Sequence, residues 1–207
     1  MKAAAAGEVV YSGNGLRGFG VDVRQEDGRI CVSRQPLRGI DVQVPADISS
    51  AAFFLVAASI VPNSDLLLKQ VGINPTRAAV IDILRAMGAQ IEVHVTGAAS
   101  GEPVADVRVR HSPLQGIDIP KQLVPIAIDE FPAILIAAAC ARGATHLTGA
   151  AELRVKESDR ITAMAAGLQA LGIAVQPRPD GMFVTGGAFC GGTVDSVGDH
   201  RIAMAFA

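Results

Sequence analysis

A repeating pattern of apolar and polar positions divides most of the chain into similar segments. Three times, an amphipathic stretch ends at a glycine and alternating apolar and polar residues follow, at residues 16–23, 84–93 and 168–176. The glycine suits the left-handed turn after a helix, and the alternation has the period of a strand. Each segment therefore predicts the end of a helix, a tight turn and a strand.

Two further stretches, residues 51–61 and 129–141, are apolar on nearly every side. Such sequences form helices that lie inside a protein rather than on its surface. A short strand is expected after each of them, at residues 66–68 and 145–147. The order buried helix, strand, amphipathic helix, strand, strand thus occurs twice, which predicts an α/β (α+β) fold of large supersecondary units.

The repeats also predict how the chain is divided. One copy of the unit covers about residues 47–120, a second covers about 121–194, and a third begins at Asp199. Residues 1–44 do not follow the pattern, so we expect a domain boundary at residues 44–46. The apolar helix that Asp199 opens is unfinished at the end of the chain, which makes a truncated domain the expectation.

Composition excludes several classes of protein. Lys and Arg number 18 against 20 Asp and Glu, so there is no basic field for nucleic acid, and the single Tyr and absent Trp argue against base-stacking modules. The apolar runs are too short for a membrane span, and residues 1–7 do not form a signal peptide. Three unpaired cysteines fit a reducing compartment. We therefore expect a cytoplasmic globular protein without nucleic-acid or membrane partners.

The densest group of charged residues is segment 154–160, which precedes an apolar stripe at residues 161–171. Counted back along the helical period, Glu157 and Arg160 fall on the buried face of the predicted helix. Together with Lys156, they would suit an anionic ligand and a proton transfer at a helix N-terminus. The alternative is an ordinary charged first turn, with Lys156 and Arg160 exposed to solvent.

Two aspartates, Asp129 and Asp199, each precede an apolar helix. Aspartate is a favoured N-cap residue, and a carboxylate at a buried helix end can also accept a proton. Arg201 follows Asp199 closely and opposes the dipole of its helix, so a bound anion would explain it more easily than stability does. Both aspartates are therefore candidates for helix capping and for chemistry.

Other polar motifs favour no particular site. The scattered histidines lack the spacing of metal ligands, and neither a phosphate loop nor a dinucleotide fingerprint occurs. Arg77 lies in a turn at residues 74–77 and is expected to be solvated. The candidate site residues are therefore the charged residues at the starts of the three predicted helices, near positions 129, 157 and 199.

Taken together, these motifs resemble the 5-enolpyruvylshikimate-3-phosphate synthase (EPSP synthase) family. The UDP-N-acetylglucosamine enolpyruvyl transferases share that family's fold but lack this signature, which makes them the less favoured alternative. The resemblance implies a prism-like fold of two domains, each with three βαβαββ units that place helices inside and sheets outside. It also implies that residues 45–207 are most of one domain and residues 1–44 a remnant of the other, the substrate domain. The matching segments are residues 45–53, 72–77, 129–132, 152–160 and 199–201.

The resemblance also implies a reaction. The family transfers the enolpyruvyl group of phosphoenolpyruvate to the 5-hydroxyl of shikimate 3-phosphate and releases phosphate, in the shikimate pathway of aromatic amino-acid biosynthesis. These two small molecules are the implied partners, with no metal or organic cofactor, and members are usually monomeric. The matching residues are Asp129, Glu157 and Asp199 for catalysis, Asp129 and Lys156 for shikimate 3-phosphate, and Arg160 and Arg201 for phosphoenolpyruvate.

Several motifs of the family do not occur in this sequence. They include an N-terminal Lys-Ser…Arg segment, the Asn-Ala-Gly-Thr and Arg-Pro motifs, and a lysine near the family's C-terminus. We therefore expect the chain alone to be an inactive fragment, or a folded remnant that binds anions weakly without catalysis. We also expect its unfinished third unit to leave Ile202, Met204 and Phe206 partly exposed and to favour self-association.

Overall fold

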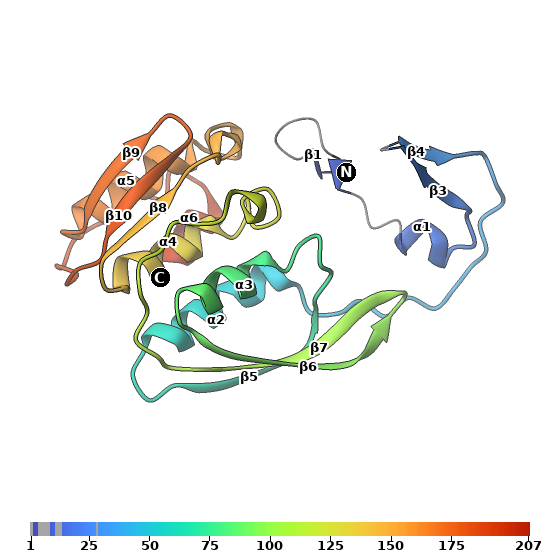
Figure 1. The fold of residues 1–207 in the computed structure, drawn as a ribbon, viewed down its shortest axis with the longest axis horizontal. Coiled ribbons are helices and arrows are strands. Elements are labelled where there is room, and N and C mark those ends of the chain that lie inside the picture. The colour runs from blue at the N-terminus through green and yellow to red at the C-terminus, as the bar shows by residue number, and fades with distance from the viewer. Residues whose placement is uncertain (1, 4–8, 11–13, 28) are drawn as a thin grey trace.

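The repeating unit predicted from the sequence is present twice in the computed structural model, which describes residues 2–3, 9–10, 14–27 and 29–207 (Figure 1). In each copy a helix, a strand, a second helix and two strands follow one another. The first copy contains α2 (Ile48–Ile60), β5 (Asp65–Gly72), α3 (Ala79–Ala86), β6 (Gln90–Ala99) and β7 (Glu102–Arg110). The second contains α4 (Phe131–Cys140), β8 (Ala144–Leu147), α5 (Arg160–Ala170), β9 (Ala174–Arg178) and β10 (Gly181–Thr185).

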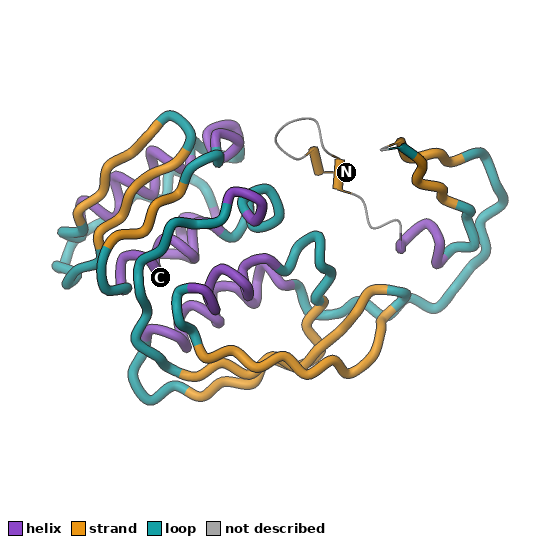
Figure 2. The backbone as a smooth tube through the Cα atoms, in the orientation of Figure 1, coloured by secondary structure: helices purple, strands orange, loops and turns teal. Residues whose placement is uncertain are grey.

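The two copies also share one sheet topology. The strand order is β5-β7-β6 in the first sheet and β8-β10-β9 in the second, with antiparallel neighbours throughout. The last strand of each unit therefore lies at the centre of its sheet, and the two outer strands run parallel to each other. Figure 2 shows the strands on the outside and the helices between the two sheets. The α/β fold class and the repeated unit of helix, strand, helix and two strands are confirmed. The first strand of a βαβαββ unit is reduced to isolated parallel bridges, from Ala46 to Val71 in the first copy and from Asp118 to His146 in the second.

The predicted glycine turns are one recurring motif at helix ends. Gly20, Gly88 and Gly172 all have a positive φ, at 83°, 97° and 83°. At Gly88 and Gly172, the next amide donates to a carbonyl five residues earlier, at 2.9 Å in both places. This is the Schellman arrangement, which satisfies carbonyls left over at a helix end.

The two apolar helices differ in how completely they are buried. Helix α4 contacts α2, α3, α5 and α6, and most of its residues are buried. Helix α2 begins at Ile48 with Asp47 as its N-cap, and it keeps one exposed side on which Phe54 is 56% accessible. The prediction that both helices are buried is therefore confirmed for α4, whereas α2 is buried on one side only.

The chain ends in α6 (His200–Phe206), which packs against α4 and α5. Ile202 is completely buried in the core, so the prediction that it would be exposed is wrong. Phe206 is half-buried and lies over Gly167 of α5, where an added Cβ would come within 2.5 Å of the phenyl ring. Met204, by contrast, is 45% exposed, as predicted.

The N-terminal part forms short elements that belong to neither repeated unit, and Gly18 within it lies near the carbonyl oxygen of Ser100, in the turn between β6 and β7 (Figure 1). Residues 33–45 connect this part to Asp47 without regular secondary structure. Most of residues 1–7, for which no signal peptide was expected, lie outside the described residues. Among the described helices, none combines the length and apolar character needed to cross a membrane. The elements are β1 (Lys2–Ala3), β2 (Val9–Val10), α1 (Asn14–Gly18), β3 (Val23–Glu26) and β4 (Arg29–Val32).

Candidate active site

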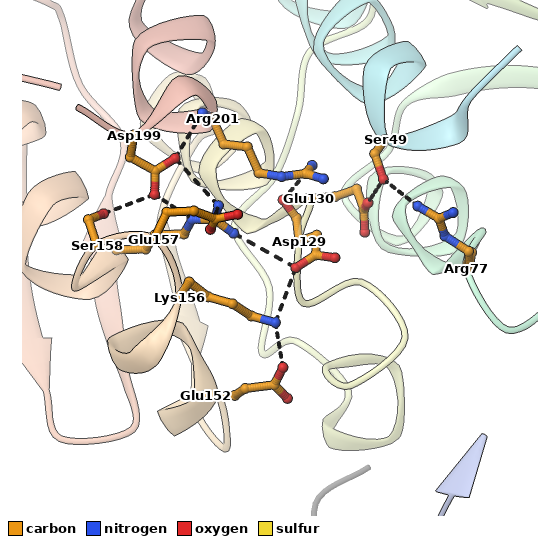
Figure 3. Close-up of polar contacts among 11 residues, drawn as sticks. Ser49, Arg77, Asp129, Glu130, Glu152, Lys156, Glu157, Ser158, Asp199 and Arg201 are labelled. Carbon is orange, nitrogen blue, oxygen red and sulfur yellow. Dashed lines mark hydrogen bonds and ion pairs between the residues drawn. The ribbon is translucent and has the colours of Figure 1, made fainter. Parts of the chain in front are cut away.

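Three helix N-termini meet in the second half of the chain and bring together all six residues predicted for the site. They come from the ends of the segments that precede α4, α5 and α6, far apart in the sequence. Figure 3 shows the side chains in one cluster between these helix ends. The residues are Asp129, Lys156, Glu157, Arg160, Asp199 and Arg201.

Arg160 is the centre of the cluster and is only 1% exposed. Its Nε donates to Asp199 Oδ2 at 2.9 Å, and its Nη2 donates to Glu157. Its Nη1 lies 3.8 Å from Asp129 Oδ1 and has no hydrogen-bond partner among the described residues. A buried guanidinium therefore faces three carboxylates, and one of its nitrogens can still donate a hydrogen bond.

Asp199 has a completely buried side chain that links Arg160 to the start of α6. Its Oδ1 accepts a hydrogen bond from the backbone N–H of Arg201 at 2.9 Å, which confirms the predicted N-cap, and its Oδ2 accepts one from Ser158 Oγ at 2.9 Å. Burial alone would raise the pKa of this carboxyl. The hydrogen bonds from Arg160, Arg201 and Ser158 outweigh burial and hold the pKa below its ordinary value, so Asp199 is ionised.

Lys156 is the second cation of the cluster. Its Nζ lies 3.3 Å from Asp129 Oδ1 and also donates to Glu152. Burial lowers the pKa of this amine, but the hydrogen bond to Glu152 and the charge of Asp129 together raise it above its ordinary value. The lysine is therefore a fixed positive charge at neutral pH. Glu152 was not predicted, although its position four residues before Lys156 could have identified it.

Asp129 and Arg201 are joined through the backbone. Arg201 Nη1 donates to the carbonyl oxygen of Asp129 at 3.2 Å. The Asp129 side chain is 21% exposed and points toward Lys156 (Figure 3). The N-cap position of α4 belongs to Glu130, so the prediction that Asp129 caps this helix is wrong. Asp129 lies one residue too early in the turn, and its carboxylate is directed at the cations instead.

Glu157 does not lie on the buried face of a helix, as the apolar stripe predicted. Its side chain is 55% exposed, although it is paired with Arg160. The reason is that α5 begins only at Arg160, after the N-cap Asp159, which accepts from Thr162 N at 3.0 Å. Lys156 and Glu157 therefore lie in a turn where helical spacing does not apply. The prediction is confirmed for Arg160 and wrong for Glu157.

A second polar group lies beside the cluster and was not predicted. Ser49 in α2 donates to Glu130, and Arg77 donates to Ser49 Oγ at 3.0 Å (Figure 3). Arg77 is exposed to solvent, as expected, with a side chain 45% accessible, and it also lies 3.4 Å from Asp47. No local pattern could have found these contacts, because the partners are 28 and 81 residues apart.

The site is rich in charge but offers no cage for a metal ion. In the part of the chain that the structure describes, no group of three or more His, Cys, Asp or Glu side chains is arranged to hold one. The cations and carboxylates instead alternate around Arg160. Such an arrangement can hold an organic anion and move a proton beside it.

The fold is that of the enolpyruvyl transferases. The transferase NikO from Streptomyces tendae has this fold with a TM-score of 0.64 at 20% identity, over 92% of this chain and 43% of that chain. Within this class, the chain belongs to the EPSP synthase (3-phosphoshikimate 1-carboxyvinyltransferase) family, whose model matches residues 2–207. The resemblance seen in the sequence is thereby confirmed.

Individual members of the family are close to this chain. The 3-phosphoshikimate 1-carboxyvinyltransferase of Nitrosococcus oceani is 62% identical over 93% of this chain and 44% of its own length. That of Methylococcus capsulatus is 60% identical over 92% of this chain and 44% of its own length. The EPSP synthase structure from Acinetobacter baumannii gives a TM-score of 0.89 at 52% identity, over 93% of this chain and 46% of that one. The chain thus spans less than half the length of these relatives.

Proposed function

We propose that this chain supplies part of the active site of an enzyme that transfers the enolpyruvyl group of phosphoenolpyruvate to the 5-hydroxyl of shikimate 3-phosphate. The relatives named as 3-phosphoshikimate 1-carboxyvinyltransferases support this assignment. The observation that carries it is the buried Arg160, whose Nη1 has no hydrogen-bond partner among the described residues although carboxylates surround the rest of the guanidinium. A substrate oxygen would complete that set of hydrogen bonds.

Arg160 and Arg201 are the proposed ligands of phosphoenolpyruvate. A guanidinium presents parallel N–H groups that match carboxylate and phosphate oxygens. The two arginines lie at the starts of α5 and α6, and Asp199 bonds to both residues. Because Asp199 is ionised and buried, it holds the Arg160 guanidinium beside the backbone of Arg201 at the start of α6 before any ligand arrives.

Asp129 and Glu157 are the proposed groups for proton transfer. In the first step the 5-hydroxyl oxygen forms a bond to C2 of phosphoenolpyruvate, its proton passes to Asp129, and C3 receives a proton from Glu157. In the second step the C2–O bond to phosphate breaks, the leaving phosphate receives the proton that Asp129 accepted, and Glu157 takes a proton back from C3, so that both carboxyl groups return to their starting states. Lys156, fixed as a cation beside Asp129, stabilises the negative charge at the hydroxyl as its proton leaves.

The division of the chain belongs to the same proposal. Residues 45–207 form an enolpyruvyl transferase domain with two units and the first helix of a third, and residues 1–44 belong to the other, substrate-binding domain. Support comes from the irregular connection at residues 33–45 and from the two matching sheets that follow it. The substrates would then bind between the two parts.

The proposal is tested by calorimetric titration of the 207-residue chain with phosphoenolpyruvate, with and without shikimate 3-phosphate. We expect measurable binding for the wild type and a loss of about tenfold or more in Arg201→Gln, which removes a charge-assisted contact worth about 1.5–3 kcal/mol. Arg142→Gln is the matched control, because Arg142 is exposed and follows the C-terminal end of α4, whereas the cluster lies at the N-terminal end of that helix. If the wild type gives no binding heat with or without shikimate 3-phosphate, the proposal that Arg160 and Arg201 form an anion-binding site is wrong.

Turnover is measured separately, as phosphate release with both substrates present. We expect none from the chain alone, because the Lys-Ser…Arg and C-terminal lysine motifs of the family are not in its sequence. Glu157→Ala is the control for background release. Turnover above that control would contradict the second candidate function, a folded domain that binds anions without catalysis.

A further inference from the structure

The carboxylate of Glu130 is the least expected charge in the protein. The residue is only 2% exposed, and it directly follows Asp129 in the turn before α4. It stands at the N-cap position of α4, but its side chain makes no capping hydrogen bond. It turns instead toward α2, where Ser49 Oγ donates to its Oε1 (Figure 3). A buried carboxylate is unfavourable unless it accepts hydrogen bonds, so the orientation of the Glu130 side chain toward Ser49 needs a physical reason.

A row of hydrogen bonds continues from Glu130 into the first unit. Ser49, itself only 2% exposed, accepts a hydrogen bond from Arg77 Nη2 at 3.0 Å. The same nitrogen lies 3.4 Å from Asp47, the N-cap of α2. Two successive hydrogen bonds, from Arg77 to Ser49 and from Ser49 to Glu130, therefore link a cation to the buried carboxylate. They also connect the start of α2 to the turn before α4.

The turn before α4 is held from two directions. On one side, Arg201 of α6 donates to the carbonyl oxygen of Asp129. On the other side, Ser49 of α2 holds the next residue, Glu130. Between these two attachments the Asp129 side chain reaches Lys156 Nζ at 3.3 Å. A shift of the turn would therefore change the distance between the Asp129 carboxylate and Lys156 Nζ.

We infer that Glu130 and Ser49 are positioning residues, which hold the Asp129 carboxylate against Lys156 through the turn that Asp129 and Glu130 share. Arg77 completes the arrangement by orienting the Ser49 hydroxyl toward Glu130. This inference deepens the proposed function, since Asp129 is its proposed proton acceptor. The contact between Asp129 and Lys156 can nevertheless be measured without substrate.

The measurement is the titration of the Lys156 amine by NMR in protein with isotope-labelled lysine, assigned by the signal that disappears in Lys156→Arg. The charged groups that face this amine are Asp129 and Glu152, and Asp129 in turn faces Arg160. We expect the pKa of Lys156 to fall toward its ordinary value in Ser49→Ala, because the charge of Asp129 helps to raise it.

Ser59→Ala is the matched control. Ser59 is also a fully buried serine in α2, but its hydroxyl donates to Leu55 of the same helix and does not reach the turn before α4. The two variants remove the same atom from the same helix. A general destabilisation of α2 would therefore change the pKa of Lys156 equally in both variants. Loss of the positioning role would change the pKa only in Ser49→Ala.

A conservative pair separates the hydrogen bond from the bulk of the side chain. Glu130→Gln keeps a carbonyl oxygen that can accept from Ser49, so the pKa of Lys156 should stay at its wild-type value. Glu130→Ala removes the acceptor and should lower the pKa of Lys156. Thermal unfolding of each variant shows whether it is folded. If Glu130→Ala does not fold, Ser49→Ala alone tests the positioning role. An unchanged Lys156 titration in folded Ser49→Ala, or an equal change in Ser59→Ala, overturns the inference.

Substrate binding then tests the proposed function separately. If shikimate 3-phosphate binds the wild type, we expect about tenfold weaker binding in Ser49→Ala and unchanged binding in Ser59→Ala. If Lys156 responds as expected but no substrate binds, the positioning role stands and the proposed function fails. If substrate binds but Lys156 does not respond, the proposed function stands and the positioning role fails.

Discussion

Arg160 has a structural role in addition to the ligand-binding role that we propose for it. Its guanidinium is buried, and the carboxylates of Glu157 and Asp199 bond to it from different parts of the chain. A buried ion pair is not stabilising by itself, because both charges lose their hydration. Removing only one partner is unfavourable, however, since it leaves the others charged and without compensation.

We therefore predict a large loss of stability for Arg160→Met. The completely buried Asp199 would lose its main cation, and breaking a buried pair in this way costs about 3–5 kcal/mol. Urea denaturation followed by circular dichroism measures the free energy of unfolding. The slope of the transition should stay the same, which shows that the variant unfolds from a similarly compact state.

Arg142→Met provides the comparison, because it makes the same change at an exposed position. Surface substitutions usually change stability by no more than about 0.5 kcal/mol. If both variants lost the same small amount, the carboxylates around Arg160 would not depend on its charge. Asp199 would then be stabilised by Ser158 and the start of α6 alone.

The identities of the site residues were predictable from sequence, but their surroundings were not. The motifs around residues 129, 156–160 and 199–201 contain all six predicted residues, and the structure brings them together. Ser49, Arg77 and Glu130 escaped prediction because their contacts depend on how α2 packs against α4. Periodicity carries no information about contacts between helices from different units.

At the scale of helices and strands, local chemistry decides where most elements end. The glycine turns after α3 and α5 were predicted from single residues, since only a residue that tolerates a positive φ fits there. Helix starts were less predictable. The apolar stretch that predicted α2 begins at residue 51, whereas the helix begins at Ile48 with Asp47 as its N-cap, and α5 begins three residues after Glu157. Several polar residues compete to cap each helix, and tertiary contacts decide among them.

Gly88→Ala should destabilise the protein by about 1–2 kcal/mol, the penalty for a Cβ in the left-handed region. Its φ is 97°, and the nearest atom to an added Cβ would be the carbonyl oxygen of Pro113 at 3.5 Å, an ordinary contact. The predicted loss therefore comes from backbone conformation and not from crowding. Thermal and urea unfolding of the purified variant measure it.

Gly191→Ala is the control for this experiment. An added Cβ at Gly191 would meet nothing within 4 Å, and its φ is not in the left-handed region. Its stability should stay within about 0.5 kcal/mol of the wild type. A Gly88→Ala variant as stable as Gly191→Ala would mean that the turn after α3 can adopt another conformation without loss.

For the molecule as a whole, the two repeated units leave an apolar groove uncovered. Residues of α2, α4 and α6 line this groove, which has a volume of about 340 Å³. Within it Val61, Phe189 and Met204 remain 52%, 42% and 45% exposed. The unfinished third unit predicted exposed apolar residues in α6 but not the contribution of α2, because a sequence that is apolar on nearly every side does not reveal which side faces the core.

We expect the 207-residue chain to self-associate through this groove, because contiguous exposed apolar surface favours association. Sedimentation velocity should show an average mass that rises with protein concentration. Met204→Glu places a charge in the groove and should shift the protein toward monomer. Val95→Glu is the control, because Val95 is 59% exposed on β6 and does not line the groove. A wild type that stays monomeric at every concentration would contradict the prediction. Association that is lost equally in both variants would show that it depends on net charge and not on the groove.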